Sequence, residues 1–126
     1  ANKFNLKKIV NVVHPIFRHK MNYFLRKNFN KKLVILDIPL LIENNLNKKK
    51  DILVFIESKK SQINHHLKKR KNYNKKIIEN LRKLQKTAAY KKKLSTYIIK
   101  NDFKLSTVKK RVKFIKNKIF NERNSS

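Results

Sequence analysis

No glycine, cysteine or tryptophan occurs among the 126 residues of this chain. Without glycine, the chain cannot form the glycine-rich loop whose backbone N–H groups cradle phosphates in many nucleotide-binding proteins. Without cysteine, it has no disulfide, no thiolate nucleophile and no cysteine-ligated metal. The lack of cysteine is compatible with a reducing cytoplasm, which is the location we expect.

Acidic residues and long apolar runs are also scarce. Seven Asp and Glu residues stand against 35 Lys and Arg residues, and the formal net charge is +28. No apolar stretch reaches the roughly 18 residues that a membrane span needs. Residues 1–8 lack the apolar core of a signal peptide. We therefore expect neither a membrane helix nor a secretion signal.

The excess of positive charge has two explanations. Dense positive charge favours nucleic-acid binding, because bound cations release counterions from the phosphates. However, only six of the basic residues are arginine, and Lys, Asn and Ile, which have A/T-rich codons, are abundant. We favour codon bias in a low-GC genome. Any nucleic-acid binding is then expected to be nonspecific.

Short apolar segments predict β-strands at residues 33–37, 52–56 and 97–99. One helix is expected before the His14–Pro15 pair and another after it, since a residue that precedes proline avoids the α-helical backbone conformation. Further helices are expected at 61–71, at 75–86 and from Ser106 onward, with Ser61 and Ser106 as N-caps. This pattern predicts an α/β fold with a parallel sheet covered by helices.

The segment 33–43 carries the most specific functional signal. Its expected strand ends at Asp37, Pro39 prevents the ladder from continuing, and apolar residues then lead to Glu43. A carboxylate at the end of a parallel strand can hold Mg²⁺ through water during phosphoryl transfer. The structural alternatives for Asp37 are a helix cap or a buried salt bridge.

Residues 37–43, Asp-Ile-Pro-Leu-Leu-Ile-Glu, resemble the Asp-x-Pro-Leu-Leu-x-Glu signature of the dephospho-coenzyme A kinase family. Other matches follow in the order of that family: the His14–Pro15 pair, an aspartate that opens the strand at 52–56, and the 97–101 segment that ends in Asn101. The resemblance spans roughly residues 6–120. An ordered set of this kind is far more specific than one motif.

The resemblance implies a partial P-loop-kinase-like parallel sheet, with three strands present, flanked by helices. It divides the chain into a helical substrate-binding segment at 1–32, a partial α/β core at 33–120 with a helical lid at about 58–94, and a frayed tail at 121–126. The central strand of the family's sheet precedes the glycine-rich loop and is absent here. The exposed sheet edges are therefore expected to favour self-association.

The activity implied by the resemblance is phosphorylation of the ribose 3′-hydroxyl of dephospho-CoA by ATP, with Mg²⁺. Asp37 would be the catalytic residue and would hold Mg²⁺ through water. The implied substrate-binding residues are His14, Pro39, Leu40 and Glu43. The implied nucleotide and lid residues are Lys69, Arg70, Arg82 and Asn101. Without its phosphate loop, this chain alone is expected to be inactive.

Each of these roles has a structural alternative. His14 can be a capping residue, Glu43 an exposed acid at a helix start and Asn101 a turn former. Pro39 and Leu40 can simply shape the turn and fill the core. The alternative function is a lysine-rich nucleic-acid-binding module without enzymatic activity, in which aromatic side chains between the lysines stack on bases.

Overall fold

The computed structural model describes residues 3–124, with side chains described from residue 15 onward. The chain forms two compact units, Ala1–Asn47 and Lys48–Ser126, and each is described by itself. Within residues 3–124, no helix has both the length and the apolar character needed to span a membrane.

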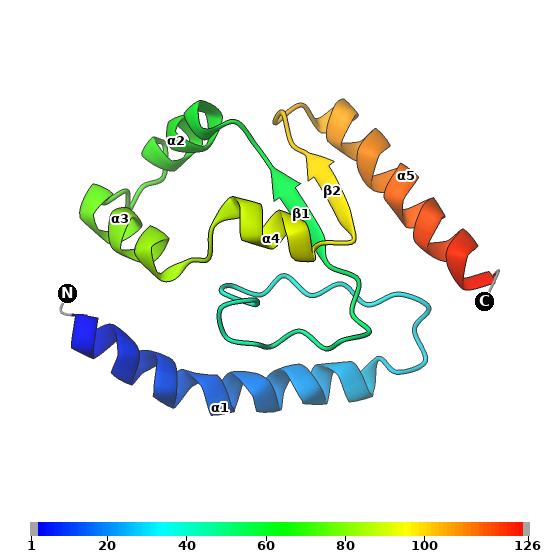
Figure 1. Ribbon diagram of the computed structural model, residues 1–126, viewed down its shortest axis with the longest axis horizontal. Helices are drawn as coiled ribbons and strands as arrows, with labels where there is room; N and C mark the ends of the chain where they lie inside the picture. Colours follow the sequence, from blue (N-terminus) through cyan, green and yellow to red (C-terminus); the bar gives the residue numbers. More distant parts are fainter. Residues whose placement is uncertain (1–2, 125–126) are drawn as a thin grey trace. The chain divides into compact units, whose positions relative to one another are not determined.

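The first unit contains one long helix, α1 (Lys3–Lys27; Figure 1). Pro15 lies inside this helix. The expected interruption at His14–Pro15 is therefore wrong. A proline inside a helix removes one backbone hydrogen bond and crowds the carbonyl four residues earlier, at a cost of about 3 kcal/mol. The helical turns on both sides of Pro15 keep the remaining ladder, so the helix continues through it.

Residues 33–38 form no strand, which corrects the first of the three expected strands. Ile35 in this segment is 78% exposed. A strand exists only when a neighbour pairs with its backbone groups, and no described strand pairs with this segment. Asp37 therefore does not lie at a strand end.

Turns follow from Pro39 to Asn45. The N–H of Asn44 donates to the carbonyl of Leu40, and that of Leu46 donates to Leu41, both over 3.0 Å. Leu40 adopts a φ of 56°, a left-handed conformation that costs a non-glycine residue about 1–2 kcal/mol. The Arg18 guanidinium donates to the carbonyl of Asn44 over 3.3 Å, and so holds the turns against α1.

The second unit contains a parallel sheet of two strands, β1 (Val54–Glu57) and β2 (Tyr97–Lys100). Val54 pairs with Tyr97, and Ile56 with Ile99. The expected strands at 52–56 and 97–99 are thus present, with β1 shifted toward the C-terminus. The α/β class with a parallel sheet is confirmed, but the described residues hold two strands and not three.

Three helices connect β1 to β2, and a fourth follows β2 (Figure 1). The connecting helices are α2 (Lys60–Lys68), α3 (Lys75–Leu84) and α4 (Ala88–Leu94). The last helix, α5 (Leu105–Asn124), continues past residue 121, where the sequence predicts a frayed tail. Helix α4 has no counterpart among the predicted helices.

Ser61 and Ser106 lie inside α2 and α5 and are not the expected N-caps. Asn74 caps α3, where its side chain accepts from the N–H of Ile77 over 3.1 Å. Thr87 caps α4 in the same way. In α2 the N-cap is Lys59, which makes no side-chain cap hydrogen bond.

The core of the second unit is small and lies between β2 and α5. It consists of Ile99, Ile115 and Ile119, with Tyr97 packed against them. The Tyr97 hydroxyl donates to Glu122 Oε2 over 2.6 Å. This hydrogen bond raises the pKa of Tyr97, because it holds the phenolic proton in place.

Candidate functional site

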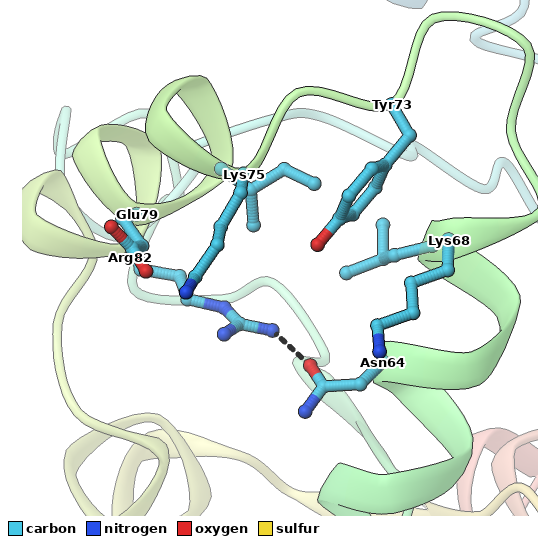
Figure 2. A pocket seen from close by; sticks show the side chains of 8 residues that line it. Asn64, Lys68, Tyr73, Lys75, Glu79 and Arg82 are labelled. Atoms are coloured by element: carbon cyan, nitrogen blue, oxygen red, sulfur yellow. Dashed lines mark hydrogen bonds between the residues drawn. The ribbon is translucent and has the colours of Figure 1, made fainter.

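A pocket of about 160 Å³ lies between α2 and α3 (Figure 2). Polar residues from both helices and from the turn between them provide most of its lining. The lining residues are Asn64, Leu67, Lys68, Tyr73, Lys75, Ile78, Glu79 and Arg82.

Arg82 is held in this pocket by Asn64, whose side-chain oxygen accepts a hydrogen bond from the guanidinium over 2.7 Å. Figure 2 shows the side chains of Lys68 and Lys75 extending into the same space. Glu79 is the single acid among the lining residues. Three cations against one carboxylate, with one guanidinium already oriented, suit an anionic ligand such as a phosphate group.

Lys69 and Arg70 lie in the turn that follows α2 and are not among the residues that line the pocket. Lys69 is the C-cap of the helix. The backbone N–H of Arg70 donates to Leu67, and its carbonyl accepts from Tyr73 over 3.0 Å. Both side chains are exposed. Of the three predicted lid cations, only Arg82 therefore faces the pocket.

Five polar residues of the pocket were not identified as site residues from the sequence: Asn64, Lys68, Tyr73, Lys75 and Glu79. The only feature of the sequence that could have indicated them is their spacing along the two helices. Asn64 and Lys68 are four residues apart on α2, and Lys75, Glu79 and Arg82 follow at intervals of four and three on α3. In a chain this rich in lysine, the same spacing occurs on many solvated faces.

Asn101 lies directly after β2 and organises the loop that leads into α5. Its side-chain oxygen accepts from the N–H of Phe103 over 2.8 Å, which is the turn-forming role named as its alternative. The next residue, Asp102, accepts from the N–H of Lys104 over 3.1 Å. That hydrogen bond, helped by the charge of Arg111, lowers the pKa of Asp102. A contact between Asn101 and a nucleotide stays a prediction.

An aromatic stack joins α2 to the Asn101 loop. The rings of His66 and Phe103 lie 4.0 Å apart, centroid to centroid, with 21° between their planes. Phe103 adopts a φ of 62°, a left-handed conformation that is costly for a bulky residue. The stack brings the loop that contains Asn101 against the helix that contributes Asn64 to the pocket.

The remaining predicted site residues belong to the first unit. His14 lies in α1, and its side chain is outside the described residues. Asp37 and Pro39 are exposed, whereas Leu40 and Glu43 are half-buried in the turns that follow. The structure thus gathers Pro39, Leu40 and Glu43 in one turn region, and their substrate-binding role stays a prediction.

The metal role of Asp37 rests on the motif alone. In the part of the chain that the structure describes, no three His, Asp or Glu side chains come together in a group that could hold a metal ion.

Comparisons with known proteins identify similar sequences. The family model for dephospho-CoA kinase matches residues 1–107. The dephospho-CoA kinase of Fusobacterium nucleatum is 30% identical over 114 residues, which cover 88% of this chain and 57% of the relative. Those of Wolbachia sp. subsp. Brugia malayi and Wolbachia pipientis wMel are 27% and 28% identical over 97 residues, which cover 75% of this chain and 49% of each relative. The chain thus spans about half the length of the curated relatives it matches.

Proposed function

Because the chain belongs to the dephospho-CoA kinase family, we propose that it is part of an ATP-dependent kinase that phosphorylates the ribose 3′-hydroxyl of dephospho-CoA. The observation that carries this proposal is the match over residues 1–107, which includes the motif at 37–43. The cationic pocket between α2 and α3 supports it, since a kinase lid must hold phosphate groups.

Arg82 is the lid residue that the geometry favours most. In phosphoryl transfer, negative charge is spread over the oxygens of the transferred group, and fixed cations stabilise it. Asn64 already orients the guanidinium of Arg82, so little reorganisation is needed when a phosphate arrives. Lys68 and Lys75 add positive charge in the same pocket. ATP therefore fits this donor set through its phosphates.

The substrate side of the proposal rests on the first unit. We assign dephospho-CoA binding to His14, Pro39, Leu40 and Glu43, and the catalytic role to Asp37. Mg²⁺, when bound, would neutralise charge on the phosphates, and Asp37 would hold it through water. The helical segment 1–32 would then provide one wall of the substrate site.

The chain lacks one part that the reaction requires. It contains no glycine and so has no glycine-rich loop to cradle the β- and γ-phosphates. We therefore propose that a segment outside these 126 residues supplies that loop, and that the chain alone is inactive.

The test is an assay of ADP release with ATP, Mg²⁺ and dephospho-CoA. The full-length protein should turn over at about 1–100 per second, the ordinary range for kinases, and the 126-residue chain should show no turnover. A folded full-length protein that releases no ADP would contradict the kinase assignment. Turnover of about 1 per second by the chain alone would contradict the need for an external loop.

A further inference from the structure

A second groove, of about 350 Å³, lies between β2 and α5 and shares no residue with the α2–α3 pocket. It combines apolar and aromatic side chains with cations, and none of its lining residues is acidic. The lining residues are Tyr97, Ile98, Lys110, Arg111, Phe114, Ile115 and Lys118.

Phe114 is the most unusual of these residues, because 67% of its surface is exposed. The neighbouring residue Ile115, together with Ile119, forms the face of α5 that packs on β2. Phe114 therefore lies beside the core face and is not held by it. Its ring offers an open aromatic surface next to Ile98, which is itself 46% exposed.

Cations flank this ring at regular spacing. Lys110, Phe114 and Lys118 are four residues apart, so they form one stripe along α5. The two lysines are separated by about 12 Å along the helix axis. Arg111 is already engaged, since its guanidinium donates to the carbonyl of Lys100 and lies 3.9 Å from Asp102. The two flanking lysines are thus the cations on either side of the aromatic ring.

We propose that this groove binds single-stranded nucleic acid, with one base stacked on Phe114 and the flanking phosphates paired with Lys110 and Lys118. Basic grooves with an aromatic platform bind single strands in this way, and the binding tolerates any sequence because every base has a flat face. Binding at this site would not depend on the base sequence, but it would take place at one surface and not over the whole charged chain. It is independent of the kinase assignment.

The first experiment measures binding of a fluorescein-labelled oligothymidylate of about 12 nucleotides to the full-length protein by fluorescence anisotropy, near 0.15 M salt. Phe114→Ala should weaken binding roughly 10- to 100-fold. Phe29→Ala is the matched control, because Phe29 is 86% exposed and precedes two lysines, but lies outside the groove. The affinity of the Phe29→Ala variant for the oligonucleotide should be unchanged. The melting midpoint of each variant verifies that it is folded.

The second experiment separates local contacts from diffuse charge. Lys110→Ala with Lys118→Ala should reduce the slope of log affinity against log salt by about 1.4, since each phosphate contact on a single strand contributes about 0.7. Lys49→Ala with Lys50→Ala removes the same charge from an exposed turn and should change the slope much less.

Three outcomes would overturn the proposal. If the two double lysine variants reduced the salt slope equally and Phe114→Ala left the affinity unchanged, the binding would be diffuse. Binding to phosphatidylserine vesicles but not to the oligonucleotide, lost in Phe114→Ala, would assign the groove to a membrane surface. A dimer in sedimentation that Phe114→Ala dissociates would assign it to a second copy of the chain.

Discussion

Asp37 is the residue on which the catalytic proposal depends most. Its side chain is exposed. A buried salt bridge, one of its structural alternatives, is therefore not what the structure shows. We therefore expect the carboxylate of Asp37 to affect activity and not folding.

Asp37→Asn in the full-length protein should lower turnover roughly 100-fold or more, because a carboxylate near the transferred phosphate acts mainly on the transition state. The free energy of unfolding should change by less than about 0.5 kcal/mol, as for other exposed substitutions. Turnover and melting midpoint measured on one sample test both expectations.

Glu122→Ala is the contrasting control for Asp37. It removes the carboxylate that accepts the hydrogen bond of Tyr97, so this variant should lower the melting midpoint while turnover per folded molecule stays normal. If Asp37→Asn instead behaved like Glu122→Ala, Asp37 would have no role in the reaction.

Arg82 permits a similar separation of roles at the α2–α3 pocket. Arg82→Lys keeps the charge but loses the planar fork that bonds Asn64 and that, in our proposal, bonds a phosphate at the same time. We expect roughly a 10-fold or larger loss of turnover, since one displaced transition-state contact costs at least about 1.4 kcal/mol.

Asn64→Ala is the matched variant for this measurement, because it removes the same hydrogen bond and leaves the guanidinium in place. Its turnover should fall less than that of Arg82→Lys. Equal losses in the two variants would indicate that the Arg82–Asn64 bond matters only for joining α2 to α3.

At the scale of elements, the helices of the second unit differ in how they begin. Asn74 caps α3 and Thr87 caps α4, whereas the N-cap of α2, Lys59, makes no side-chain hydrogen bond. Helices of seven to ten residues are marginal without tertiary packing. Each cap is therefore a large part of what holds its helix.

Asn74→Ala should destabilise the chain by about 1 kcal/mol, because the N–H of Ile77 loses its acceptor. Asn72→Ala provides the control, since Asn72 lies two residues earlier in the same turn region and is not a cap. Urea denaturation followed by circular dichroism measures both. A cap role is excluded if the two variants lose the same stability.

At the scale of the whole molecule, the most consequential feature is the edge of β1 with which no described strand pairs. The carbonyls of Leu53 and Glu57 accept bonds from residues at either end of β2. In a parallel ladder alternate residues point to opposite sides, so the backbone groups of Val54 and Ile56 face away from β2. The side chain of Ile56 is also 53% exposed. Such an edge promotes association.

We expect the 126-residue chain to self-associate through this edge at moderate salt, where repulsion between molecules of charge +28 is screened. Ile56→Lys should reduce the association, because a lysine on an edge strand opposes pairing with another chain. Sedimentation equilibrium measures the average mass.

Ile77→Lys on α3 is the control for Ile56→Lys, because Ile77 is equally exposed, at 54%, and lies on a helix. It should leave the association unchanged. A monomeric chain at all concentrations, or equal effects of the two variants, would show that the β1 edge is not the contact surface.

The sequence by itself determined the features that depend on local pattern. The apolar runs located both strands of the sheet, and the sequence also located the helix α3. The motif at 37–43, together with the ordered matches around it, pointed to the family that the comparisons confirm. Side-chain periodicity and short motifs are properties of neighbouring residues, so they are readable without the fold.

The tertiary structure alone decided what depends on distant neighbours. The apolar run at 33–37 reads as a strand, yet it forms none, because pairing requires a second backbone that the described residues do not supply. Pro15 reads as a helix break but is accommodated within α1. The Arg82–Asn64 contact joins residues 18 positions apart. In a chain so rich in lysine, only the arrangement of α2 and α3 around their pocket distinguishes the cations that share it from those that are merely solvated.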